Sequence, residues 1–260
     1  MSGLEGRHAL VTGAGSGIGA AIAEALAARG ARVSLAGRRA EPLRDVAAKL
    51  PDGAARTLDG FDVTDAQAIA RGLEQARAAF GPIAILVNNA GAAPSAPFGK
   101  TDAAMWAHVL ATDLTSVYLV TQAALADVRS FGAAGRIINI ASTAGLTGYA
   151  YVSAYCAAKH GVVGLTRALA LELARSGVTV NAVCPGFTQT ALIDEAIDNI
   201  VAKTGRTREA ALAQLSASNP QGRLVSPREV ADCVLWLASA AASSINGQAI
   251  AVAGGEVMSG

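Results

Sequence analysis

The sequence predicts an α/β fold, a single-domain Rossmann-like doubly wound parallel sheet of about seven strands with helices on both faces. Three observations predict it. Short apolar runs alternate with helical patterns from residue 8 onward. The runs are continuously apolar, as at 83–88, which is typical of strands covered on both faces. A glycine cluster at 12–19 also separates the first strand from the first helix.

The elements follow in a regular order. Strand-like runs lie at 8–11, 32–36, 57–62, 83–88, 136–141, 178–183 and 248–252. Helical patterns occupy 18–29, 41–49, 65–80, 101–129, 154–175 and 227–239. Ser226 and Glu229 predict a capping box at the last helix, and Thr64 with Gln67 predicts a similar box at the third. Residues 187–221 break the alternation with helical runs at 191–202 and 208–216, so we expect one domain over 1–260 with a substrate flap at 187–221.

The composition excludes several classes of protein. Of the 260 residues, 52% are hydrophobic and 16% charged, with 21 Lys plus Arg against 20 Asp plus Glu. A nucleic-acid partner would need a basic face, and a disordered chain would be less apolar. No uncharged run offers about 20 consecutive apolar residues, so we expect no membrane span. The three cysteines form no CxxC pair, so we expect no metal site. The N-terminus resembles no secretory signal, so we expect a cytoplasmic protein.

The glycine cluster predicts a nucleotide site. Small residues let the backbone approach a pyrophosphate, and the start of a helix supplies free amides and a partial positive charge. The expected contacts are Gly13, Ser16, Gly17, Ile18 and Gly19. The alternative is an ordinary structural loop.

The end of the second strand favours NADP(H) as the cofactor. An NAD site normally has an acid here that accepts the ribose hydroxyls, whereas this chain has Arg38 and Arg39 and no carboxylate before Glu41. Guanidinium groups match phosphate oxygens in geometry and charge. If the two arginines are only solvated surface residues, NAD(H) remains possible.

Ser142, Tyr155 and Lys159 form the candidate catalytic group. Tyr155 and Lys159 are four residues apart in a helical pattern and so share a face, and Ser142 follows the preceding strand. A phenol has an unperturbed pKa near ~10, and an ammonium about 4 Å away favours the phenolate by roughly 1–3 pKa units. Lys159 is therefore expected to bring Tyr155 towards a working range for proton transfer.

With these motifs the chain resembles the short-chain dehydrogenase/reductase family almost end to end. The resemblance implies hydride transfer between a nicotinamide and a carbonyl or secondary alcohol, with Tyr155 as general acid or base, Ser142 holding the substrate oxygen and Lys159 binding the nicotinamide ribose. It implies further cofactor contacts at Asp62, Val63, Asn89, Ala90, Gly91, Pro185, Gly186, Thr188 and Thr190. Substrate contacts are expected at Ser142, Thr143, Ala144, Tyr149, Tyr155 and Phe187.

Asp113 departs from the family pattern, which usually has Asn before this Leu to help hold a water that relays protons from the lysine. A carboxylate is nearly isosteric, accepts hydrogen bonds from water and adds charge near Lys159. We hypothesise a retained relay with an altered pH profile. Alternatively, Asp113 is a helix residue that pairs with backbone amides.

The sequence thus predicts an NADP-dependent ketoreductase, similar to those acting on 3-oxoacyl thioesters and polyketide chains. The alternative enzyme is an NAD-dependent secondary-alcohol or 3-hydroxybutyrate-type dehydrogenase working oxidatively. A catalytically silent nucleotide-sensing regulator would be expected to lack the tyrosine or the lysine. Helices 101–129 and 154–175 are apolar on more than one face, and family members are commonly tetramers, so we expect a homotetramer.

Overall fold

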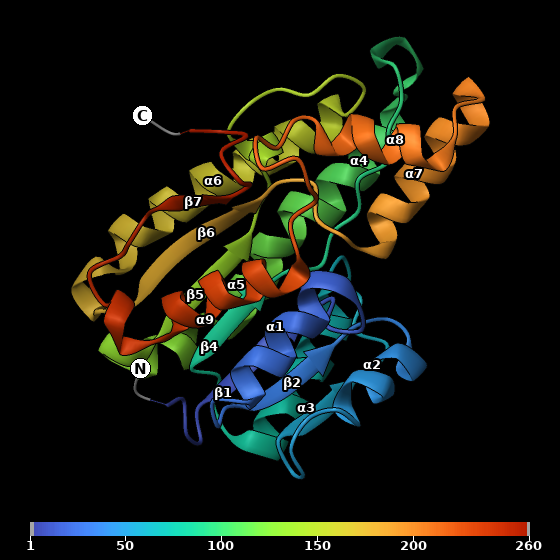
Figure 1. Ribbon diagram of the computed structural model, residues 1–260. Helices are drawn as coiled ribbons and strands as arrows, with labels where there is room; N and C mark the ends of the chain where they lie inside the picture. Colours follow the sequence, from blue (N-terminus) through green and yellow to red (C-terminus); the bar gives the residue numbers. More distant parts are fainter. Residues whose placement is uncertain (1–2, 259–260) are drawn as a thin grey trace.

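Seven parallel strands form one sheet in the computed structural model, which describes residues 3–258 (Figure 1). Their order is β3-β2-β1-β4-β5-β6-β7. The strands are β1 (His8–Thr12), β2 (Arg32–Ala36), β3 (Ala55–Leu58), β4 (Ile85–Asn88), β5 (Arg136–Ile140), β6 (Thr179–Pro185) and β7 (Ala249–Val252). The strand order changes direction between β1 and β4, which is where ligands bind in such sheets, outside the carboxyl ends of the strands. The predicted fold class is confirmed.

Helices cover both faces of the sheet (Figure 1). They are α1 (Gly17–Ala27), α2 (Ala40–Ala47), α3 (Ala66–Phe80), α4 (Ala103–Leu110), α5 (Ser116–Ser130), α6 (Ser153–Leu173), α7 (Ala191–Thr204), α8 (Arg208–Ser216) and α9 (Pro227–Ala238). Val11 packs with Ile22 and Val230 of α1 and α9, whereas its neighbour Leu10 packs with Leu73 and Val120 of α3 and α5. Both faces of β1 are buried, and this explains the continuous apolar run.

Some boundaries differ from the predicted ones. The third strand ends at Leu58 rather than at residue 62, because Gly60 has a φ of 68° and turns the chain. The capping box predicted for Thr64 and Gln67 is wrong. Asp65 caps α3 and accepts a hydrogen bond from the backbone N–H of Gln67 at 2.8 Å, while the Thr64 hydroxyl donates to Asp62.

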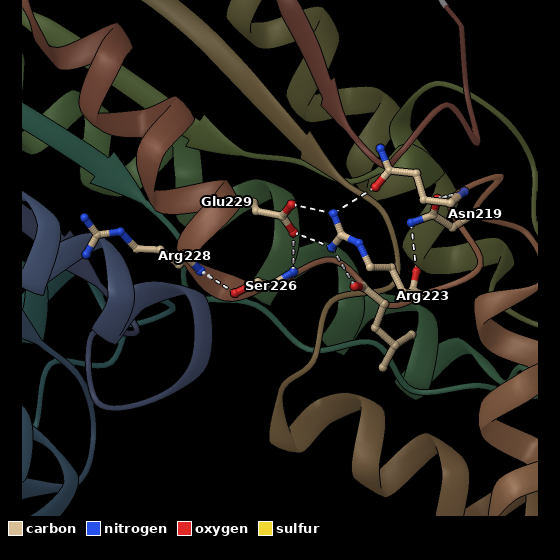
Figure 2. Close-up of polar contacts among 7 residues, drawn as sticks. Asn219, Arg223, Ser226, Arg228 and Glu229 are labelled. Carbon is tan, nitrogen blue, oxygen red and sulfur yellow. Dashed lines mark hydrogen bonds and ion pairs between the residues drawn. The ribbon is translucent and has the colours of Figure 1, made fainter.

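The predicted capping box at α9 is confirmed. The Ser226 side chain accepts from the backbone N–H of Arg228 at 3.2 Å, and the Glu229 carboxylate accepts from that of Ser226 at 2.8 Å. Figure 2 shows that Arg223 extends this network, since its guanidinium contacts Glu229 and its carbonyl oxygen accepts from Asn219. The chain returning from α8 is therefore fixed at the start of α9.

The predicted helix 101–129 consists of three pieces. Helices α4 and α5 are joined by a π-helical turn, Ala111–Thr115, which inserts an extra residue into the turn. By length and composition alone, the combined stretch Ala103–Ser130 could cross a membrane, and it is the one such helix among the residues described. Its second half packs on β4, β5 and α3, as expected of a helix that covers the sheet.

Helices α7 and α8 form an arm between β6 and α9, drawn in orange in Figure 1. Arg208 of α8 forms ion pairs with Asp194 and Asp198 of α7. A cavity of about 110 Å³ lies between the two helices, with Ile193 and Leu212 in its lining.

Candidate active site

Helix α6 positions Tyr155 and Lys159 one turn apart on the same face, as their spacing predicts. The Lys159 ammonium lies 5.4 Å from the centre of the Tyr155 ring. It also donates to the carbonyl oxygen of Ile140 at 3.1 Å, and only 3% of the residue is exposed. The lysine is thus held at the carboxyl end of β5.

Ser142 lies between the end of β5 and a short turn over Thr143–Gly145. Its hydroxyl oxygen accepts from the backbone N–H of Ala144 at 3.1 Å, which fixes its direction. The turn packs closely on α6, since a Cβ at Gly145 would lie 2.7 Å from the carbonyl oxygen of Lys159. This close contact places the Ser142 side chain near the Tyr155 phenol, where it acts to lower the pKa of Tyr155.

Asp113 completes the group from the π-helical turn. Its carboxylate lies 3.3 Å from the Lys159 ammonium and accepts from the backbone N–H of Ala92 at 3.2 Å. Asp113 is fully buried, and a Cβ at Gly91 would come within 2.5 Å of its oxygen. The structure therefore brings together all four residues predicted to be catalytic. The pairing of Asp113 with a backbone amide, which belongs to the alternative interpretation of this residue, is present beside the ion pair.

Burial dominates the electrostatics of this group. It raises the pKa of the Tyr155 phenol, although the Lys159 charge acts to lower that pKa and the Asp113 charge acts to raise it. Burial likewise raises the pKa of Asp113, against the effect of Lys159. Burial disfavours the Lys159 ammonium, but the charges of Tyr155 and Asp113 outweigh this effect and raise its pKa. Lys159 thus acts on Tyr155 in the predicted direction, but the pKa of Tyr155 is raised overall.

The glycine turn fits a phosphate group. Gly13 and Gly17 have φ values of 64° and 53°, which favour glycine. A Cβ at Gly19 would lie 2.3 Å from the carbonyl oxygen of Gly13. Ser16 makes no capping hydrogen bond, and the first turn of α1 contains no acid. The first amides of α1 are therefore left for an anion, as predicted for a dinucleotide.

Asn89 supports this turn from the end of β4. Its side-chain amide donates to the carbonyl oxygens of Thr12 and Gly13 at 2.9 and 3.2 Å. The backbone N–H of Ala90 donates to the Thr12 hydroxyl oxygen at 3.0 Å. Asn89 and Ala90 thus border the glycine turn, whereas Gly91 packs against the Asp113 carboxylate.

Arg38 lies exposed just after β2, next to Arg39. Hydrogen bonds from Thr64 lower the pKa of Asp62, and the Arg38 charge lowers it further. Arg38 and Asp62 therefore border the same region, beside the buried Val63. No carboxylate follows β2 before Glu41, so the region suits an added phosphate better than two ribose hydroxyls.

The other predicted residues lie at the end of β6 and around Ser142. Pro185 ends β6, and the Thr188 hydroxyl donates to the carbonyl oxygen of Gly186 at 2.9 Å. The Thr190 methyl lies near the start of α1, 3.1 Å from a Cβ placed on Gly17. The Tyr149 hydroxyl lies 2.9 Å from the Thr143 hydroxyl, and the Tyr149 and Phe187 rings meet edge to face at 6.0 Å.

Comparison with known proteins identifies the family. The sequence model described as short chain dehydrogenase matches residues 7–200. The chain belongs to this family. It is 44% identical over 251 residues to cis-4-hydroxycyclohexanecarboxylate dehydrogenase of Sinomonas cyclohexanicum, covering 96% of each chain. It is 40% identical over 258 residues to 3-oxoacyl-(acyl-carrier-protein) reductase FabG of Vibrio cholerae, covering 98% of this chain and 99% of that one.

A solved structure agrees with this assignment. A variant of actinorhodin polyketide ketoreductase with NADPH is similar at a TM-score of 0.89 and 39% identity, over 96% of this chain and 97% of that one. As a short chain dehydrogenase, the protein is an NAD(P)-dependent oxidoreductase that acts on a CH–OH or C=O group.

One residue of this short chain dehydrogenase was not predicted from the sequence. Glu256 lies 2.7 Å from the Tyr149 hydroxyl. It is a lone acid between apolar residues after Gly254 and Gly255, and the sequence carries no other signal of its contact.

Proposed function

We propose that this short chain dehydrogenase uses NADPH to reduce a ketone, in particular a 3-oxoacyl thioester or a related ketone. The observation that carries the proposal is the placement of Ser142, Tyr155 and Lys159 at the end of β5. Only β4 separates β5 from β1, which leads into the glycine turn. Arg38 and the absence of an acid at the end of β2 support NADPH. The relatives named as a 3-oxoacyl reductase and a polyketide ketoreductase support the substrate class.

Side chains of the protein bind the substrate oxygen and protonate it. The glycine turn would hold NADPH, which would supply the hydride. Ser142 and Tyr155 hold the carbonyl oxygen by hydrogen bonds, which favours the negative charge that develops there. As the carbon–oxygen π bond opens, the Tyr155 phenol gives its proton to that oxygen. The carbonyl carbon has then gained the hydride and the oxygen the proton, and the product is a secondary alcohol.

Lys159 and Asp113 support the proton transfer. The Lys159 ammonium stabilises the phenolate that Tyr155 becomes, and it would bind the nicotinamide ribose. Asp113 fixes the ammonium and accepts hydrogen bonds, so it would help return a proton to Tyr155 through Lys159. In this proposal Asp113 is a positioning residue, because it acts through the lysine.

Substrate would lie between Ser142 and the arm of α7 and α8. Thr143, Ala144, Tyr149 and Phe187 surround the approach to Ser142 and would contact it. The segment 187–221 would cover bound substrate as a flap of a single domain.

The test is reduction of a ketone panel, followed by the loss of reduced nicotinamide. The panel holds 3-oxoacyl thioesters, cyclic ketones and, in reverse, secondary alcohols, with NADPH and NADH in parallel. We expect turnover with NADPH and a loss of roughly 10²-fold or more in Tyr155→Phe. Absence of turnover with every compound would favour a nucleotide-sensing regulator, and a strong preference for NADH would contradict the role of Arg38.

A second candidate is an NAD-dependent 3-hydroxybutyrate-type dehydrogenase working oxidatively. The arm favours this candidate, because residues 203–206, at the end of α7 and the start of the loop before α8, resemble the corresponding segment of those enzymes. The same panel separates the two, since this candidate predicts faster oxidation of a hydroxy acid with NAD⁺ than reduction of a thioester.

The proposal includes a homotetramer in the cytoplasm, with no nucleic-acid or membrane partner. Exposed apolar side chains on α5 and α6 support the assembly, with Tyr118 48% and Leu171 82% exposed. The free cysteines, Cys156, Cys184 and Cys233, support a reducing compartment.

A further inference from the structure

Glu256 reaches the substrate side of the site from the C-terminal segment. After β7 the chain turns through Gly254 and Gly255, whose φ values are 60° and 95°. The turn is closely packed, because a Cβ at Gly254 would lie 2.0 Å from the Asn219 side chain. The Glu256 carboxylate is thereby brought to the end of β6, where one of its oxygens would lie 2.7 Å from a Cβ on Gly186.

Tyr149 orients this carboxylate. Its hydroxyl lies 2.7 Å from one Glu256 oxygen and 2.9 Å from the Thr143 hydroxyl. A phenol has one proton, so Tyr149 donates to the carboxylate and accepts from Thr143. Burial raises the pKa of Tyr149 to about 12, which keeps that proton in place. Hydrogen bonds through Tyr149 therefore link Glu256 to Thr143, the residue that directly follows Ser142.

The charge of Glu256 is not compensated by a cation. Among residues 3–258, no Lys, Arg or His forms an ion pair with it. The residue is half-buried, so water screens its charge only in part. Phe187 packs edge-on against the ring of Tyr149 and adds an apolar surface on the same side. The surface near Ser142 therefore combines the apolar ring of Phe187 with the negative charge of Glu256, which has no cationic partner among the described residues.

We propose that Glu256 is a specificity-determining residue that disfavours anionic ketones and admits ketones uncharged near the reacting carbonyl. This inference rests on the proposed function and narrows its substrate class. A free 3-oxo acid carries a carboxylate two bonds from the reacting carbon, whereas the corresponding ester or thioester carries no charge there. Like charges within a few ångströms of each other near a protein surface repel enough to change affinity by roughly tenfold or more.

The experiment compares acetoacetate with ethyl acetoacetate, which share the reacting ketone and differ in charge. For each, kcat/KM is measured with saturating NADPH, and the readout is the preference for the ester over the acid. We expect the wild type to prefer the ester and Glu256→Gln to reduce that preference roughly tenfold or more. Glu256→Asp, which restores the charge, should restore the preference. Glu74→Gln on the exposed face of α3 removes the same charge far from the site and should leave the preference unchanged.

A binding measurement tests this inference independently of the proposed function. The Kd of each compound is measured by calorimetry with enzyme saturated with NADP⁺, which requires no turnover. If the wild type reduces no ketone, the proposed function fails, yet Glu256→Gln should still narrow the ratio of the two Kd values. The inference is overturned if the wild type takes the acid as well as the ester, or if the ratio is the same in wild type and Glu256→Gln, including the case in which neither compound binds.

Discussion

Lys159 and Asp113 form a buried ion pair beside Tyr155, so the phenol experiences the field of a nearly neutral pair rather than that of a free ammonium. The effect of Lys159 that favours phenolate is opposed by Asp113, and burial opposes it too. An amide at residue 113 would leave the ammonium uncompensated. The acid at this position therefore favours the protonated phenol, which is the form that reduction of a ketone requires.

Replacing Asp113 by Asn should therefore move the pH profile in a defined direction. The Asp113 charge raises the pKa of Tyr155, so its removal lowers that pKa. In the reductive direction the variant should lose activity at a lower pH than the wild type does. In the oxidative direction it should gain activity at a lower pH. The measurement is kcat/KM against pH in both directions.

The matched control for this experiment is Asp52→Asn, which removes a charge from an exposed turn. Its pH profile should coincide with that of the wild type. Coincident profiles for Asp113→Asn and the wild type would show that Asp113 does not act on Tyr155.

Arg38 should determine the choice of cofactor. A hydrogen bond to a charged group is worth about 1.5–3 kcal/mol, so Arg38→Gln should lower kcat/KM for NADPH by roughly ten- to 150-fold. The value for NADH should change little, because NADH lacks the 2′-phosphate. Arg71→Gln, on the exposed face of α3, is the control. An equal loss with both cofactors would mean that Arg38 does not contact that phosphate.

Sequence spacing predicts contacts between site residues on the same helix, but not contacts between distant segments of the chain. Tyr155 and Lys159 share a helix, so their separation along the chain fixes their geometry. Glu256 and Tyr149 are 107 residues apart, and no local pattern predicts their contact. The ion pair of Asp113 with Lys159 likewise depends on how the π-helical turn packs on α6.

At the level of elements, apolar periodicity predicted the strands well where both faces are buried, as at β2, whose bounds match. It failed where a turn residue ends an element, as at Gly60 after β3. The π-helical turn at Ala111–Thr115 was also not predicted, because one extra residue in a helix hardly changes the apolar pattern. That turn carries Asp113, so the deviation from regular helix lies within the site.

The capping box of α9 gives a stability prediction. Ser226→Ala should lower the free energy of unfolding by about 1 kcal/mol, measured by urea denaturation. Ser218→Ala, at an exposed residue after α8, should change it much less. Equal losses in both variants would exclude a special role for the cap.

The same box predicts a dependence on pH. Hydrogen bonds from Arg223 and from the backbone of Ser226 lower the pKa of Glu229 to about 2. Because this pKa is lowered on folding, the stabilisation is present above the ordinary value of 4.5 and is lost as the pH falls towards 2. The difference in unfolding free energy between wild type and Glu229→Gln should shrink over that range. A difference that stays constant would contradict the role of the charge.

For the molecule as a whole, the apolar excess of the composition has two locations. One is the sheet, whose central strands are buried on both faces. The other is the outer face of α5 and α6, where apolar side chains remain exposed. Exposed apolar side chains such as those on α5 and α6 are typical of helices that also pack against another subunit.

Assembly should therefore depend on that face. We expect the wild type to sediment as a tetramer, and Leu171→Glu to shift it to smaller species, because an uncompensated buried carboxylate costs several kcal/mol. Phe98→Glu is the control, since Phe98 is 78% exposed but lies outside α5 and α6. If the wild type sediments as a monomer at assay concentration, the exposed apolar face does not serve assembly. If Phe98→Glu dissociates the tetramer as well as Leu171→Glu does, the interface does not lie on α6.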